Sequence, residues 1–139
     1  DVSYGVEAIN TLPPNAQKTK LKTNEQYISI LYANLFQKAL SVNEMVEITH
    51  CIEAMGDKET IHEVIISNLM NKPDVIIPSD SLMRSDISSF LTEAYTRFYV
   101  RDITEAEKEY LTQFIEVNPN FTVEMLYTAF SLSDEYQYY

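Results

Sequence analysis

Residues 24–36 read NEQYISILYANLF, and this stretch decides the fold class. Its apolar side chains recur in pairs four residues apart, which places them on one wide face of an α-helix over about two and a half turns. Thr23 or Asn24 is the expected N-cap, because a short polar side chain can accept a free backbone N–H there. The members of the face are Tyr27, Ile28, Leu31, Tyr32, Leu35 and Phe36.

Two more helices are predicted immediately downstream. Ser41-Val42-Asn43-Glu44 is a capping box that begins the first of them, and Gly56 is the expected left-handed residue that ends it. Asp57 or Thr60 begins the next, and Pro73 ends it. The inward positions predicted for these two helices are Met45, Ile48, Ile52, Met55, Ile61, Val64, Ile65 and Leu69.

The second half of the chain repeats the first. A shift of 63 residues, which becomes 61 after a two-residue deletion, aligns caps and breakers as well as apolar residues. Unrelated helices would share the apolar pattern without the caps, and that alternative stays open. The aligned pairs include Tyr32 with Tyr95, Phe36 with Tyr99, Lys38 with Arg101, Ser41 with Thr104, Glu44 with Glu107, Ile48 with Leu111, Leu69 with Phe130 and Asp74 with Glu135.

The sequence therefore predicts an all-α domain of about six helices in two three-helix units. The units cover residues 24–75 and 86–139 and share one core, since about 50 residues alone are marginal for stability. Residues 72–85 connect them, with one helical turn expected from Ser81 to Arg84.

Composition excludes several classes of function. The chain has 139 residues, a formal net charge of −11 and a sequence pI of about 4.5. This negative charge disfavours binding to nucleic acids and to anionic membrane surfaces. No apolar run reaches the roughly 18 residues of a membrane span. With Gly at only 2 positions there is no phosphate-binding loop, and the chain has no EF-hand sequence. No cofactor is expected.

The N-terminal segment differs from the rest. Residues 1–23 carry Pro13-Pro14 and a basic cluster of Lys18, Lys20 and Lys22, without a helical period. We expect an extended arm that the isolated domain has little reason to order; it could dock a partner, join an anchor or simply be a disordered end. Because the chain begins at Asp1, we expect that a targeting segment has been removed. The predicted location is extracytoplasmic, in the periplasm or at the cell surface, with the cytoplasm as the alternative.

Two Glu-x-x-His motifs are the only metal-binding pattern. Glu47 and His50, and Glu59 and His62, lie at i and i+3, the spacing that di-iron bundles use. The predicted helices are short, however, and the repeat replaces the first motif with Tyr110-x-x-Gln113. We expect surface residues here, and keep a metal-binding or enzymatic bundle as the alternative function.

Cys51 is expected to be a small buried hydrophobe. It aligns with Phe114, which we expect in the core, and lies beside Ile52. His50 cannot pair with it for catalysis, because adjacent helix residues diverge. With no group to form an oxyanion hole, the sequence predicts a protein that is not an enzyme.

The second unit carries motifs that resemble a known bacterial module. It is similar to a small helical domain of unknown function from surface and adhesin-like proteins, whose units end in Ser-Pro-Glu-aromatic, and its opening resembles the phycobilisome linker domain. The first unit departs at Gln37-Lys38, and Asp134 replaces the expected Pro. The resemblance implies an accessory or scaffolding role without catalytic residues. It rests on Phe90-x4-Tyr95-x2-Phe98, Arg101-Asp102-Ile103-Thr104 and Leu132-Ser133-Asp134-Glu135-Tyr136.

Aromatic residues mark the expected contact surface. Tyr136, Tyr138 and Tyr139 crowd the C-terminus, and Tyr4 lies in the arm. Tyrosine is favoured at protein interfaces, because one rigid ring supplies area and a hydrogen bond. The sequence thus predicts a non-catalytic interaction or scaffolding module with a protein partner, as an accessory part of an extracytoplasmic assembly. The alternative is that the arm folds back on these tyrosines within one chain.

Overall fold

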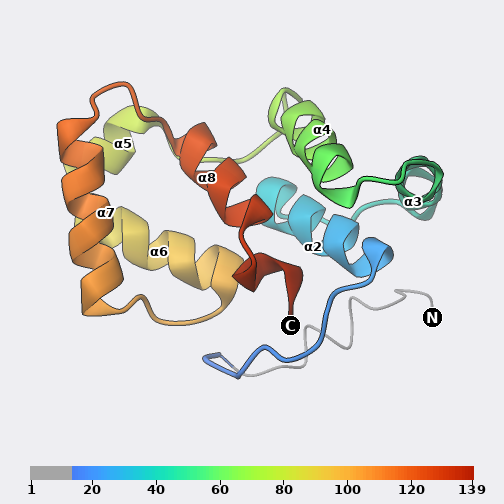
Figure 1. Cartoon of the computed structure of the whole chain (residues 1–139). Coiled ribbons are helices and arrows are strands. Elements are labelled where there is room, and N and C mark those ends of the chain that lie inside the picture. Colours follow the sequence, from blue (N-terminus) through green and yellow to red (C-terminus); the bar gives the residue numbers. More distant parts are fainter. Residues whose placement is uncertain (1–13) are drawn as a thin grey trace.

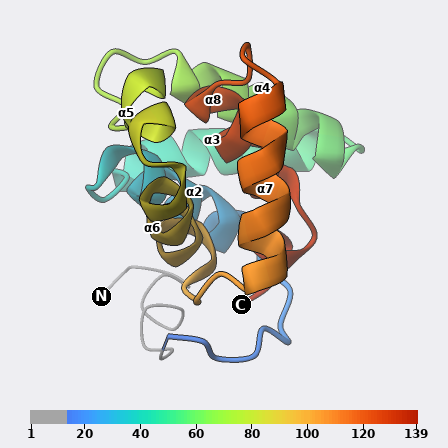
Figure 2. The ribbon, with the colours of Figure 1, turned by 90° about the vertical axis from the view of Figure 1, so that its left-hand side faces the viewer.

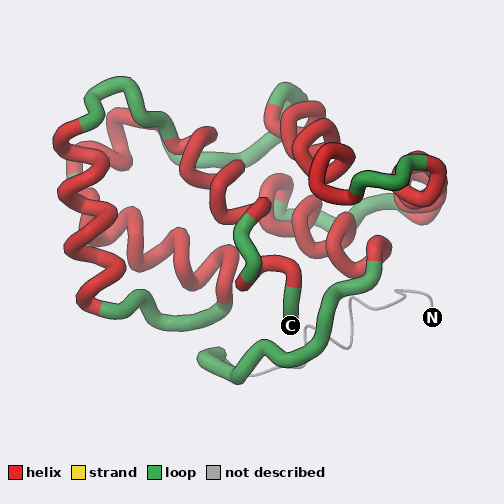
Figure 3. The backbone as a smooth tube through the Cα atoms, viewed as in Figure 1, coloured by secondary structure: helices red, strands yellow, loops and turns green. Residues whose placement is uncertain are grey.

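The computed structural model describes residues 14–139, apart from the side chains of Lys58 and Glu59, and over this range it is all-α (Figures 1 and 3). Tyr4 therefore lies outside the described residues. The elements in chain order are α2 (Asn24–Phe36), α3 (Val42–Ala54), α4 (Lys58–Met70), α5 (Asp80–Ser85), α6 (Ile87–Tyr99), α7 (Glu105–Val117), α8 (Val123–Leu132) and the 3-10 turn η1 (Glu135–Gln137).

The caps explain where the helices begin. Thr23 and Thr104 form capping boxes at the starts of α2 and α7, and the Ser41 hydroxyl accepts from the N–H of Glu44 at the start of α3. α2 and α6 have the same length and lie 63 residues apart, as do α3 and α7. The third helices differ, since α4 has 13 residues and α8 has 10. Duplication of the whole unit stays a prediction.

Both first helices of the units end in the same way. Gln37 and Val100, again 63 residues apart, adopt left-handed backbone with φ of 57° and 54°. Their N–H groups donate to the carbonyls of Ala33 and Thr96, which satisfies the last turn of α2 and α6. Gly56, the expected left-handed residue, has no positive φ; α3 ends instead at Ala54 with an extended Met55.

One hydrophobic cluster spans both units, as predicted. Tyr27 of α2, Ile66 of α4, Leu91 of α6 and Tyr127 of α8 are all almost fully buried within it. α4 packs on α8 in the centre, while α3 and α7 lie at opposite ends of the molecule (Figures 1 and 2). The shared core follows from this central contact between the third helices.

Peripheral placement leaves α3 and α7 with narrow buried faces. α7 buries only Ile115, so Phe114 is 36% exposed. Cys51 is likewise exposed, which contradicts the predicted burial. The alignment of Cys51 with Phe114 gave no information about burial, because neither helix has neighbours on both sides. Val64 of α4 and Met55 are also exposed, contrary to the expected inward positions.

The described part of the arm is ordered, contrary to the expectation from sequence. Leu21 forms an antiparallel bridge with Tyr138, and the Lys20 carbonyl accepts from the N–H of Tyr139 at 2.7 Å. The Lys18 ammonium donates to Glu135 at 3.0 Å. Residues 18–22 thus pack against the C-terminal segment, while Asn15 bonds to Val100 and Asp102 after α6, and this is the alternative in which the arm folds back.

Two arginines tie the units and the connector together. Arg97 of α6 donates to the backbone carbonyls of Asn34 and Ile76, reaching α2 and the connector. Arg84 of α5 donates to three carbonyls around the end of α7, those of Ile115, Asn118 and Phe121. Within the described range, no helix is long and apolar enough to cross a membrane.

Candidate functional site

The C-terminal tyrosines do not form one exposed patch. Tyr136 is 1% exposed: its hydroxyl accepts from the Asn34 amide at 2.6 Å, and its ring meets Tyr27 edge-on. Tyr136 therefore cannot contact a partner, which corrects the sequence expectation. Tyr138 is 41% exposed, and Tyr139 is half-buried against the arm. The backbone pairing with residues 19–22 pulls the segment onto the domain.

The residues of the metal motifs have separate environments. Glu47 and His50 are exposed on α3, whereas His62 is buried on α4 and stacks on Tyr27 with ring centroids 3.9 Å apart. The expected surface position of His62 is therefore wrong. Glu59 lies outside the described side chains. Among the residues that are described, no group of three His, Cys, Asp or Glu side chains could hold a metal ion.

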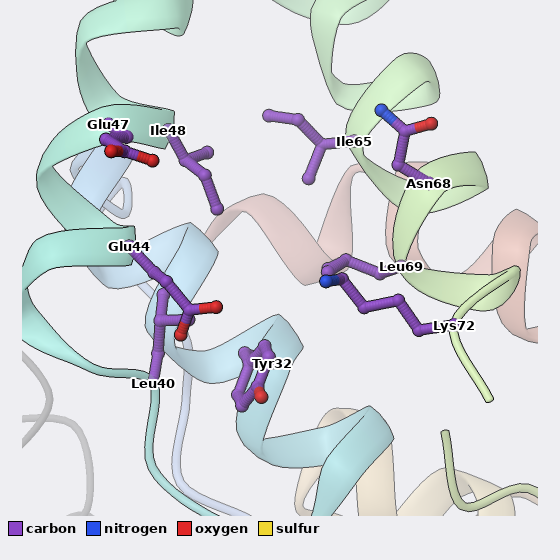
Figure 4. A pocket seen from close by; sticks show the side chains of 9 residues that line it. All are labelled: Tyr32, Leu40, Glu44, Glu47, Ile48, Ile65, Asn68, Leu69 and Lys72. Carbon is purple, nitrogen blue, oxygen red and sulfur yellow. The ribbon is translucent and has the colours of Figure 1, made fainter. Parts of the chain in front are cut away.

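A groove in the first unit is the strongest candidate site (Figure 4). It has a volume of about 310 Å³ and lies between α3 and α4, with Tyr32 of α2 beneath them in this view. Its apolar lining is buried or half-buried, so it belongs to the edge of the core. The apolar members are Tyr32, Leu40, Ile48, Ile65 and Leu69.

The groove has a polar rim whose α3 side is acidic and whose α4 side carries an amide and an ammonium. Glu44 and Glu47 extend from α3, Asn68 from α4 and Lys72 from the turn after α4, and all four side chains are exposed (Figure 4). The carboxylates outnumber the one ammonium, on a chain of net charge −11. Such a groove can hold an apolar side chain at its base and a cationic group at its rim.

Beside the groove, an ion pair closes the end of the first unit. The Lys38 ammonium donates to Asp74 at 3.2 Å, and both side chains are more than half exposed. This bond raises the pKa of Lys38 and lowers that of Asp74. Because water screens the pair, it contributes little to stability and can be exchanged for another partner.

The second unit has a denser cluster at the aligned positions. The Arg101 guanidinium donates to both oxygens of Glu107, at 3.0 and 2.8 Å, and to both oxygens of Glu135, at 2.7 and 3.0 Å. It also lies over the rings of Tyr95 and Tyr99, 5.0 and 5.6 Å from their centroids. A guanidinium differs from an ammonium in its planar shape, its fork of N–H donors and its ability to stack on aromatic rings. The contacts of Arg101 use all three properties.

The ionisation of the cluster follows from these contacts. Hydrogen bonds from Arg101 lower the pKa of Glu107 to about 2. Burial would raise the pKa of Glu135, but hydrogen bonds from Arg101 and Lys18 hold it below its ordinary value. The same two carboxylates raise the pKa of Arg101. The cluster is therefore fully charged at neutral pH.

The sequence did not identify the groove as a site. Tyr32, Ile65 and Leu69 fit the apolar period and were expected only as core. The sequence feature that could have indicated the groove is a set of differences between the aligned units. The first unit has Glu47 where the second has Tyr110, Leu69 where it has Phe130, and Lys72 where it has Ser133. Smaller or charged residues at aligned core-edge positions indicate a surface that is left open.

Comparisons with known proteins give no relative. No protein-family model matches the chain, and neither a curated protein nor a solved structure matches it. The resemblance to a bacterial helical module stays a prediction.

Proposed function

We propose that this protein is a non-catalytic interaction or scaffolding module, and that the groove between α3 and α4 binds a basic segment of a partner protein. The observation that supports this most is the combination of an apolar base with the Glu44 and Glu47 carboxylates at an open rim. An extracytoplasmic assembly is the proposed setting.

The chemistry of the groove favours binding over reaction. Glu44 and Glu47 are exposed, and the rim lacks a nucleophile paired with a base. A basic segment suits the site, because the net charge of −11 accelerates its approach and the rim carboxylates fix its orientation. The apolar base then supplies the contact area.

Site-specific photo-cross-linking in the source cells tests the proposal. A photoreactive amino acid replaces Asn68 at the groove rim, and in a matched chain it replaces Gln113, an exposed amide on α7. We expect a discrete protein adduct from position 68 that is absent from position 113. Identical adducts from both positions, or none from position 68, would contradict binding in the groove.

Charge reversal provides the second arm of the test. Glu47→Lys should remove the adduct at position 68, because it places an ammonium where the partner's cation binds. Glu116→Lys makes the same change on the exposed face of α7 and should leave the adduct intact. An adduct that survives Glu47→Lys would argue against a basic partner.

A further inference from the structure

Arg101 shows how this fold binds a guanidinium. Two carboxylates each accept two hydrogen bonds from it, and two aromatic rings lie beneath it. Glu107 does this while it also caps α7, since its Oε1 accepts from the Thr104 N–H and hydroxyl, each at 3.0 Å. Capping and cation binding are thus compatible in one carboxylate.

The first unit has related acidic and aromatic groups at the aligned positions. Glu44 occupies the aligned capping position, and its Oε1 accepts from the Ser41 hydroxyl at 3.0 Å. Tyr32 stacks on Phe36 with centroids 4.3 Å apart, at the positions of Tyr95 and Tyr99. Asp74 occupies the position of Glu135.

The residue aligned with Arg101 is Lys38, and its ammonium occupies only the Asp74 side of this arrangement. Its side chain is 57% exposed and donates to Asp74. Lys38 is not among the residues that line the groove, whereas Tyr32 and Glu44 are. The space that Arg101 occupies against Tyr95 and Glu107 therefore corresponds to an open groove against Tyr32 and Glu44.

We propose that the groove binds an arginine side chain of the partner protein, with the guanidinium between the Glu44 carboxylate and the Tyr32 ring. This inference rests on the proposed function and names the group that the groove recognises. Arginine is favoured over lysine because its planar group donates two parallel hydrogen bonds to one carboxylate and stacks on a ring. Its aliphatic stem would contact Ile48 and Leu69.

Lys72 is the feature that opposes this binding. It is the only cationic side chain that lines the groove, and it occupies the position of Ser133 in the second unit. Because Lys72 is exposed, its ammonium can move away into water when a guanidinium binds. It should weaken binding without preventing it, and its removal should strengthen binding.

The probe for the test is a synthetic peptide, acetyl-Leu-Ala-Arg-Ala-Leu-amide, with lysine and citrulline versions as controls. Titration at low ionic strength is followed by NMR shifts of the backbone amides of residues 32, 44 and 69. We expect saturable shifts with the arginine peptide, affinity about fivefold lower for lysine and no saturation for citrulline, which is isosteric and neutral.

Three variants locate the interaction. Glu44→Gln should lower the affinity about tenfold while α3 stays capped, because the Ser41 hydroxyl still accepts from the backbone N–H of residue 44. Lys72→Ser should raise the affinity about twofold. Glu116→Gln on α7 should leave it unchanged.

The outcomes separate the two proposals. Equal affinity for arginine and lysine peptides, or unchanged affinity of Glu44→Gln, would overturn the arginine inference while leaving the groove as a site for a basic segment. The absence of any saturable shift would also overturn it, and cross-linking at position 68 would then decide the proposed function independently.

Discussion

At the scale of single residues, Lys22 has the most unusual environment. Its ammonium lies 3.5 Å from the centroid of the Tyr136 ring and donates to the Tyr136 carbonyl. Burial and the nearby charge of Lys18 lower the pKa of Lys22 to about 7. The carboxylate of Glu135, next to Tyr136 in the chain, is bonded to Lys18 and Arg101. Neutral Lys22 is therefore easier to bury than charged Lys22.

The docking of the arm should consequently depend on pH. Between pH 7 and about 10.5 the detached arm binds more protons than the docked arm, so docking strengthens as pH rises through this window and is constant below it. From pH 6 to 9 we expect a gain of about 1 to 2 kcal/mol, since the free ammonium is solvated in the detached arm. The methyl resonances of Leu21 report the docked fraction.

Lys22→Met is the matched control for this titration. Methionine keeps the length and packing of the stem and removes the charge, so its arm should stay docked over the whole range. Measurements stop at pH 9, because burial raises the pKa of Tyr95 and Tyr99 to about 12 and the fold loses stability above pH 10. An unchanged pH dependence in Lys22→Met would assign the effect to another group.

Arg84 is expected to be the most important charged residue for stability. Its guanidinium donates to three carbonyls at 2.7 to 2.9 Å, around the end of α7. Arg84→Met should lower the free energy of unfolding by about 2 to 3 kcal/mol, because carbonyls lose charged donors. Chemical denaturation measures the loss, and Lys20→Met, at an exposed basic residue of the arm, should change stability by less than about 0.5 kcal/mol.

At the scale of helices, Val100 is a strained position. It adopts φ of 54°, which a β-branched side chain disfavours, and it is 47% exposed, so its side chain contributes little packing. Val100→Gly should raise the stability by about 1 kcal/mol, as relief of strain exceeds the entropic cost of glycine. Thermal unfolding measures the gain, and Val46→Gly, at an exposed position inside α3, should be destabilising by about 1 kcal/mol.

Helix starts were predictable, while burial and some helix ends were not. Ser41 and Thr104 begin helices because a hydroxyl followed by Glu satisfies free N–H groups locally, whatever surrounds them. The burial of Cys51 depends on which helices flank α3, and that is a property of the tertiary arrangement. Val100 ends α6 although its own preference opposes this, so tertiary contacts override local propensity.

Prediction of the candidate site failed for a related reason. The same period that makes Tyr32 and Leu69 core residues also places them at the edge where α3 and α4 separate. Periodicity identifies the apolar face of a helix but not how far a neighbour covers it. Tyr136 is the opposite case, a residue expected at the surface that is buried. Its position in a polar C-terminal segment gave no sign of the residues that bury it.

At the scale of the whole molecule, the two units should not fold separately. The core of the first unit includes Tyr27 and Ile66, which pack in one cluster with Tyr127 and Tyr136 from the second. A fragment of residues 14–79 would expose these surfaces to water. We expect it to melt without a cooperative transition, whereas residues 14–139 should melt cooperatively. A sharp calorimetric peak from the fragment would show that the first unit is autonomous.

The antiparallel bridge between the arm and the C-terminal segment has a mechanical consequence. Residues 19 and 20 pair with Tyr139, and residue 22 pairs with Gln137. A force that pulls residues 19 and 139 apart therefore acts first on the hydrogen bonds at one end of this paired segment. The bonds then break one after another, as in a zipper, rather than together in shear. Tension would peel the arm away at low force and lengthen the molecule, while the helical core stayed intact.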